Sequence, residues 1–79
     1  MDKLDYAILE FLQNHATTKM SAKTRKEIRA EFAVKADTLY RRIKGLIENG
    51  SVTKGIIDGR SHTYFITKSG IEKLREAMK

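Results

Sequence analysis

Two short runs of β-branched and aromatic residues constrain the fold of this chain most strongly. The runs SVTKGII (residues 51–57) and HTYFIT (residues 62–67) are separated only by DGRS. Runs of this composition form strands, and an Asp-Gly pair between two of them is a strong signal for a tight β-hairpin. We therefore predict a hairpin over residues 51–67, a narrow ribbon with Arg60 at its tip.

The segment before the hairpin contains two helical patterns. We expect the first helix to run from Lys3 to Asn14. Its apolar residues recur at the spacing of one helix face: Leu4, Ala7, Ile8, Phe11 and Leu12. A second, short helix is expected after Thr24 and should end near residues 32–34. Thr24 and Glu27 have the spacing of a capping box, in which each side chain satisfies a free backbone amide of the other residue.

A third helix is expected to begin within KADTLYRR (residues 35–42) and to run to Asn49, with Gly50 as its C-terminal stop. Its apolar stripe consists of Leu39, Ile43, Leu46 and Ile47. A last helix is expected in KSGIEKLREAMK, residues 68–79. The order of these elements predicts an α+β, mainly α, fold. It is a winged helix-turn-helix, with a three-helix core, a two-stranded β-hairpin wing and a C-terminal helix.

Length and composition favour one small domain spanning residues 1–79. A chain of 79 residues is near the lower limit for an unaided apolar core. It has no cysteine, so disulfides and thiolate zinc sites are excluded, and a reducing compartment is favoured. No apolar run approaches the roughly 20 residues that span a bilayer, and the N-terminus lacks the features of a signal peptide. We expect a cytoplasmic protein with no membrane association.

The positive charge of the chain is concentrated in its middle. The formal net charge is +6, yet the first 18 residues hold one lysine against three acidic residues. Residues 19–54 hold ten Lys and Arg against four Asp and Glu. A localised basic excess is typical of a protein that binds a polyanion. A basic surface that serves only solubility is the alternative that charge leaves open.

Two stretches resemble parts of known regulators. KADTLYRRIKGLIENGSV (residues 35–52) resembles the recognition helix of winged-helix regulators, in which an Arg-containing helix ends in Glu-x-Gly before the first wing strand. DGRSHTYFITKSG (residues 58–70) resembles the wing of MarR-type regulators, and PadR-type regulators are similar in the second strand. The resemblance covers roughly residues 20–72 and implies a winged-helix DNA-binding protein. The sequence departs from the pattern at Ala33, where glycine is usual, and at Lys35, where a Ser or Thr cap is usual. We expect Asp37 to take over that cap.

This fold indicates which residues meet DNA. Steps of 100° per residue put Thr38, Arg41 and Lys44 opposite the apolar stripe of the third helix, where they suit a major groove. Arg60 at the wing tip suits a minor groove or a phosphate, and the start of the second helix suits phosphates. The alternatives are a solvated helix face and an Arg60 that pairs with Asp58. The predicted DNA-binding residues are Lys23, Thr24, Arg25, Thr38, Tyr40, Arg41, Arg42, Lys44, Lys54 and Arg60.

We therefore predict sequence-specific binding to double-stranded DNA by a transcriptional regulator, with repression as the expected mode. The same physics fits a plasmid or phage replication or partition factor. Two rivals are a winged helix that binds an acidic protein, and an RNA-binding protein that stacks bases on Tyr64 and Phe65. No enzyme, metal site or cofactor is expected. His15 and His62 are far apart in the chain, and no nucleophile or phosphate-loop motif is present.

We also predict a homodimer formed through the terminal helices. One winged helix contacts about one half-site, and a specific operator generally requires two. Tyr6 and Leu9 lie outside the apolar stripe of the first helix, and the last helix offers Ile71, Leu74 and Met78. The alternative is that the last helix simply packs on the first.

Overall fold

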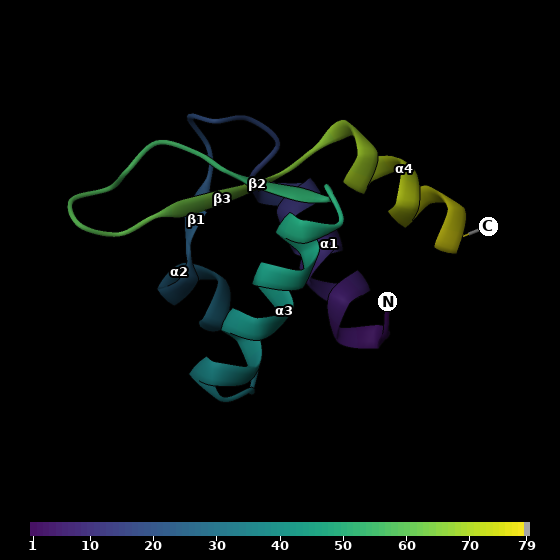
Figure 1. Ribbon diagram of the computed structural model, residues 1–79, viewed down its shortest axis with the longest axis horizontal. Coiled ribbons are helices and arrows are strands. Elements are labelled where there is room, and N and C mark those ends of the chain that lie inside the picture. Colours follow the sequence, from purple (N-terminus) through teal and green to yellow (C-terminus); the bar gives the residue numbers. More distant parts are fainter. Residues whose placement is uncertain (79) are drawn as a thin grey trace.

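The structure is a computed structural model that describes residues 1–78 and has the predicted order of elements (Figure 1). The elements are α1 (Lys3–His15), β1 (Lys23–Thr24), α2 (Arg25–Arg29), α3 (Ala36–Glu48), β2 (Val52–Lys54), β3 (Thr63–Ile66) and α4 (Lys68–Ala77). The predicted mainly helical winged helix-turn-helix is confirmed. Within residues 1–78, no helix is long and apolar enough to cross a bilayer.

The sheet has three strands: the two predicted for the wing, β2 and β3, and the short strand β1 beside them. β3 is the central strand, and it pairs antiparallel with β2 on one side and with β1 on the other. β1 contains only Lys23 and Thr24, which lie opposite Tyr64 and Thr63. Because α2 begins at the residue after β1, this pairing attaches the wing directly to the helix-turn-helix.

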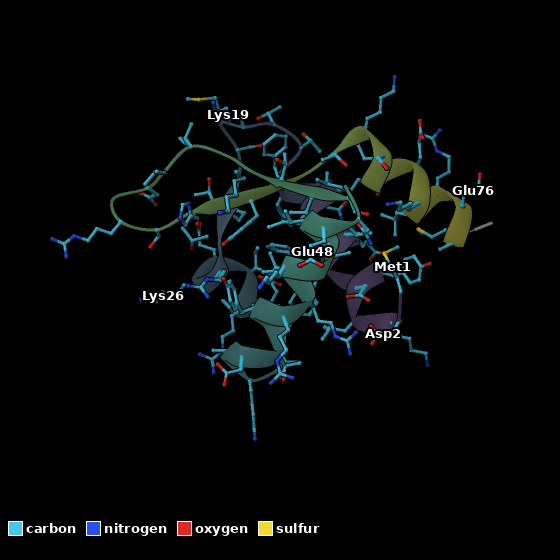
Figure 2. The ribbon with its side chains drawn as sticks, viewed as in Figure 1. Met1, Asp2, Lys19, Lys26, Glu48 and Glu76 are labelled. Carbon is cyan, nitrogen blue, oxygen red and sulfur yellow. The ribbon has the colours of Figure 1, made fainter. Side chains whose placement is uncertain are left out.

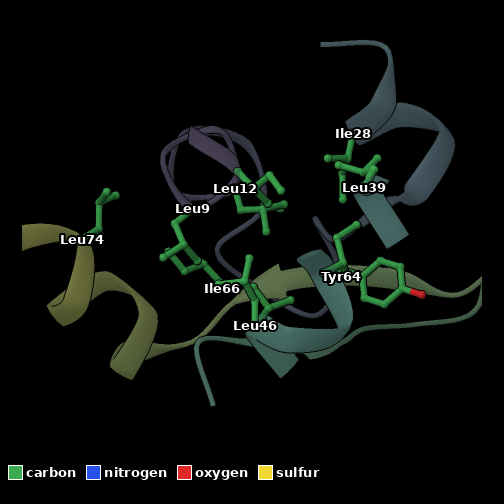
Figure 3. Packing of buried hydrophobic residues seen from close by; sticks show 12 residues of the cluster. Leu9, Leu12, Ile28, Leu39, Leu46, Tyr64, Ile66 and Leu74 are labelled. Atoms are coloured by element: carbon green, nitrogen blue, oxygen red, sulfur yellow. The ribbon is translucent and has the colours of Figure 1, made fainter. Parts of the chain in front are cut away.

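The core lies between the four helices and the sheet (Figure 3). Ile8, Leu12, Ile28 and Ile43 are fully buried in it. Leu9 is also fully buried, whereas Ala7 is exposed, so the predicted apolar face of α1 was wrong at these two positions. The reason is that α4 packs against α1 and covers a second side of that helix.

This packing also corrects the predicted dimer surface. Leu9 and Leu74 belong to the monomer core, with 0% and 2% of their surface exposed. They are therefore unavailable to a partner in the folded monomer, and α4 packs on α1 as in the alternative. Tyr6 and Ile71 are partly buried against the core, and Met78 is 66% exposed.

Local hydrogen bonds define the helix ends. α1 begins with a capping box between Asp2 and Asp5, and the predicted capping box of Thr24 and Glu27 begins α2. α2 is shorter than predicted and ends at Arg29. The cap of α3 is Lys35, which makes no side-chain bond, and Asp37 lies in the first turn, so the expected cap by Asp37 was wrong.

Hydrogen bonds join the two arms of the wing at its base and at its tip. β2 and β3 pair near the core, and a two-residue turn, Gly59 and Arg60, closes the tip between Asp58 and Ser61. The Asp58 and Ser61 backbones exchange hydrogen bonds of 2.9 and 3.0 Å. Gly59 has φ +63°, which a type II′ turn requires at its first central residue and which glycine adopts without strain.

Candidate nucleic-acid interface

The recognition helix α3 presents one polar face. Leu39 on its opposite side is buried next to Ile28 of α2, so the two helices of the helix-turn-helix pack against each other (Figure 3). Arg41 and Lys44 are exposed, and Thr38 is half-buried at the start of the same face. The sequence-predicted triplet is therefore presented together on one side of the helix.

A hollow of about 370 Å³ lies between α2, the beginning of α3 and the wing. It is called the basic hollow below. Its lining residues are Thr24, Arg25, Lys26, Arg29, Ala36, Leu39, Arg60, Ser61, His62 and Tyr64. Four of these carry a positive charge, and they come from two segments that are far apart in the sequence. The pairing of β1 with β3 brings these segments together. Figure 2 shows Lys26 on the side of α2, while Asp2 and Glu76 lie on the side of the two termini.

Only some of the residues that line the basic hollow were predicted from the sequence. Arg25 and Arg60 were predicted, but Lys26, Arg29 and His62 were missed. Arg29 follows Arg25 by four residues, so the two share a helix face, a spacing visible in the sequence. His62 adjoins the turn that carries Arg60, and it received no predicted role because a metal or acid-base pair with His15 was not expected. The structure holds Arg29 near the following turn, because its Nε donates to the Val34 carbonyl at 3.3 Å.

An aromatic contact organises one edge of the basic hollow. The guanidinium carbon of Arg25 lies 4.4 Å from the centre of the Tyr40 ring. Tyr40 is 45% exposed. Tyr64 on β3 is only 3% exposed, and its burial raises the pKa of its hydroxyl. Because Tyr64 is a core residue, it cannot stack on a base, and the RNA-binding alternative loses one of its two candidates.

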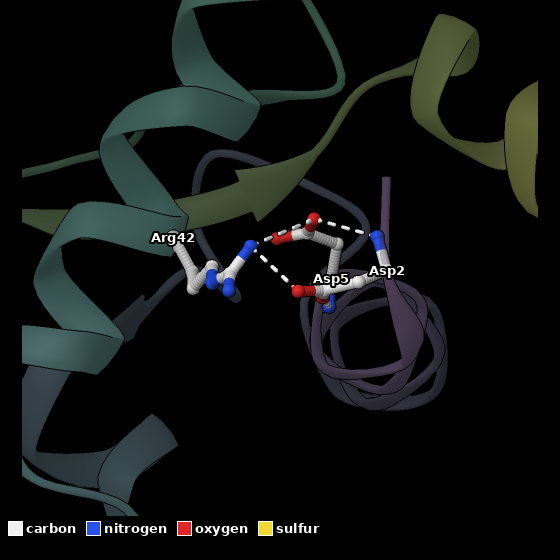
Figure 4. Close-up of polar contacts among 3 residues, drawn as sticks. All are labelled: Asp2, Asp5 and Arg42. Atoms are coloured by element: carbon white, nitrogen blue, oxygen red, sulfur yellow. Dashed lines mark hydrogen bonds and ion pairs between the residues drawn. The ribbon is translucent and has the colours of Figure 1, made fainter.

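Arg42 has a different partner from the one expected (Figure 4). Its Nη1 lies 2.7 Å from Oδ2 of Asp2 and 3.6 Å from Oδ2 of Asp5. A hydrogen bond from the Asp5 amide and the charge of Arg42 lower the pKa of the Asp2 carboxyl. The guanidinium thus ties α3 to the start of α1, and we remove Arg42 from the residues proposed to bind DNA.

The remaining predicted residues lie at the edges of this region. Lys23 of β1 and Lys54 of β2 lie opposite Tyr64 on the two strands that pair with β3, and neither lines the basic hollow. Lys54 is exposed and Lys23 is half-buried. Within residues 1–78, Arg60 makes no ion pair with Asp58, so its charge is not neutralised by that neighbour.

Comparisons with known proteins identify similar chains. No protein-family model matches. The DNA-binding protein TubR of Clostridium botulinum C phage is 34% identical over 79 residues, which is 99% of this chain and 98% of that protein. The solution structure of the DNA-binding TubR fragment from Clostridium botulinum is 33% identical, with a TM-score of 0.77 over 98% of this chain and 96% of that one.

TubR from Bacillus megaterium pBM400 has a TM-score of 0.86 at 20% identity, over 99% of this chain and 87% of that one. Solved winged-helix regulators of other families are also similar in fold. These similarities confirm the resemblance to winged-helix regulators that the recognition helix and the wing indicated.

Proposed function

The chain belongs to the TubR family of DNA-binding proteins, and from this premise we propose that it binds double-stranded DNA through α3, the basic hollow and the wing. The observation that carries the proposal is the basic hollow itself. It sets cations of α2 and of the wing tip around one concave surface beside the recognition helix. A groove of this charge matches the phosphate backbone, which supplies most of the affinity in protein–DNA binding.

The arrangement suggests how the duplex docks. α3 enters the major groove, where Arg41 bonds a guanine and Thr38 contacts a thymine methyl group or a phosphate. The strand that separates this groove from the next one crosses the basic hollow, where Arg25 and Arg29 neutralise its phosphates. Arg60 reaches the adjacent minor groove from the wing tip.

The phage origin of the similar TubR protein favours one of two cellular uses of this binding. The sequence is compatible with a transcriptional regulator and with a plasmid or phage replication or partition factor. The relative with 34% identity comes from a phage, which favours the second use. Deleting the gene should then lower the inheritance of the replicon that carries it. A change in transcript levels with normal inheritance would instead assign the protein to gene regulation.

Binding is tested with four labelled nucleic acids. These are a random duplex, a duplex selected from the replicon, single-stranded DNA and a structured RNA, each titrated at two salt concentrations. We expect the selected duplex to bind most tightly and all duplex binding to weaken with salt. Absent or salt-insensitive duplex binding would favour the alternative in which the basic face binds an acidic protein.

We further propose a homodimer that uses the exposed parts of the terminal helices. With Leu9 and Leu74 in the core, the residues of the predicted dimer surface that keep accessible apolar area are Tyr6, Ile71 and Met78. Sedimentation equilibrium at micromolar concentration should give twice the monomer mass of 9.0 kDa, and Met78→Glu should lower it. A species that stays monomeric both alone and on a palindromic site would remove the dimer.

A further inference from the structure

Tyr40 lies beside the basic hollow without lining it. The Arg25 guanidinium, which does line the hollow, has the Tyr40 ring over one face at 4.4 Å. Tyr40 comes from α3 and Arg25 from the first residue of α2, so the contact also joins the two helices of the helix-turn-helix. The guanidinium thus lies between the Tyr40 ring and the space where a phosphate is proposed to bind.

The ring holds Arg25 without neutralising it. The ion pairs within residues 1–78 are those of Arg42 with Asp2 and Asp5, so no carboxylate pairs with Arg25. A carboxylate would fix the guanidinium, but it would also cancel the charge and occupy the N–H donors. An aromatic face attracts the cation through its π-electrons and leaves the in-plane donors available.

Tyr64 lies in the same cluster. It is buried, it lines the basic hollow, and its burial raises the pKa of its hydroxyl, while the nearby charge of Arg25 acts to lower it. Tyr64 and Arg25 both line the basic hollow, and the Tyr40 ring lies over the Arg25 guanidinium.

We propose that Tyr40 is a positioning residue, whose ring holds Arg25 in the orientation that binds a backbone phosphate in the basic hollow. This inference rests on the proposed function. It differs from the sequence-based prediction, in which Tyr40 itself contacts DNA. A free arginine loses rotamer entropy when it becomes ordered on DNA. A stacked arginine has already lost part of this rotamer entropy before DNA binds, so it binds a phosphate at a smaller entropy cost.

Duplex affinity of four variants tests the proposal. Tyr40→Phe keeps the ring and removes the hydroxyl, so it should bind within twofold of the original protein. Tyr40→Leu removes the ring and should bind about two- to fivefold more weakly, the range that a partly exposed cation–π contact supports. Arg25→Ala should lose at least as much. Tyr40→Leu combined with Arg25→Ala should bind no more weakly than Arg25→Ala alone, because the ring acts only through the arginine.

Two results would overturn the positioning role. One is a loss for Tyr40→Phe equal to that for Tyr40→Leu, since the hydroxyl would then contact DNA directly. The other is additive losses in the double variant. Failure of the unmodified protein to bind any duplex would instead overturn the proposed function, and this inference with it. Thermal unfolding of each variant verifies that the fold is intact, which we expect because Tyr40 is half exposed.

A measurement without DNA examines the stacking by itself. The ring current of Tyr40 should shift the Arg25 side-chain protons upfield in the NMR spectrum. The shift should persist in Tyr40→Phe and disappear in Tyr40→Leu. Identical Arg25 chemical shifts in all three proteins would show that the ring does not hold the guanidinium, whatever the DNA affinities are.

Discussion

Two glycine-to-alanine changes, both inside helices, should alter stability in opposite directions. Gly70 lies in the first turn of α4 and is buried where this helix meets the end of α3 and the start of β2. A Cβ at Gly70 would lie 2.2 Å from the Ser51 carbonyl oxygen and 2.8 Å from Cγ1 of Ile66. Gly45 lies on the outer face of α3, and a Cβ there would have no atom within 4 Å.

The expected magnitudes follow from these surroundings. Alanine in a helix is favoured over glycine by about 1 kcal/mol, and Gly45→Ala should gain nearly all of it. Gly70→Ala gains at most the same amount. It also forces a methyl group against backbone, at the upper end of the roughly 1–3 kcal/mol that overpacking costs. The net change for Gly70→Ala should be a loss of about 2 kcal/mol, because the Ser51 carbonyl cannot rotate away as a flexible side chain would.

Thermal and urea unfolding measure both effects. In a domain of this size, a change of 1 kcal/mol moves the midpoint by about 4–8 °C. Gly45→Ala should therefore unfold several degrees higher than the original protein, and Gly70→Ala should unfold roughly 10 °C lower. If Gly70→Ala were as stable as the original, the docking of α4 described here would be incorrect. A loss of stability in Gly45→Ala would mean that its face of α3 is not open.

Four further predictions concern DNA binding and stability. Log affinity for duplex DNA should fall with log salt at a slope of about −4 to −5 if about five phosphates are neutralised, and a flat titration would contradict this. Arg41→Ala should cost about 1–3 kcal/mol and relax base preference, whereas Arg60→Ala should weaken all duplexes more evenly, as competition binding can show. Leu9→Glu should lower the free energy of unfolding by more than about 3 kcal/mol, because it buries an unpaired charge. A folded variant with an unchanged urea midpoint would contradict the packing of α4 on α1. Backbone hydrogen bonds lower the pKa of Asp2 and of Glu27 below the ordinary values of 3.8 and 4.5. The stability that these two ionised carboxylates add to the fold should be complete above about pH 5 and should be lost as the pH falls through their pKa values in the folded protein. Urea unfolding at several pH values measures this loss.

Local signals predicted the presence and order of the helices and the wing correctly because each signal depends on nearby residues. The capping box at Thr24 fixed the start of α2, and Gly50, with φ +82°, fixed the end of α3. The Asp-Gly pair likewise predicted the turn of the wing, because a tight turn depends only on the few residues that form it. The position of β1 could not be predicted, because a strand of two residues has no pattern of its own. It forms only where β3 supplies its partners.

Contacts between distant segments account for the other misses. The burial of Leu9 depends on α4, and no spacing within α1 shows that a second element covers it. Arg42 was predicted to bind DNA because it lies on the third helix, but Asp2 and Asp5 of the N-terminal segment pair with it in the folded chain. The basic hollow was missed for the same reason, since its two halves meet only through the pairing of β1 with β3.

The attachment of the wing to α2 through β1 has a consequence for the topology of the bound DNA. Backbone hydrogen bonds on both sides of β3 keep the base of the wing at a fixed separation from the helix-turn-helix. In a duplex, the distance from a major groove to the neighbouring minor groove varies with helical twist. In the proposed docking, overwound or underwound DNA would move the minor groove away from Arg60 while α3 stayed in the major groove. Occupancy would then depend on superhelical density, so a supercoiled and a relaxed circle of the same sequence would bind the protein differently.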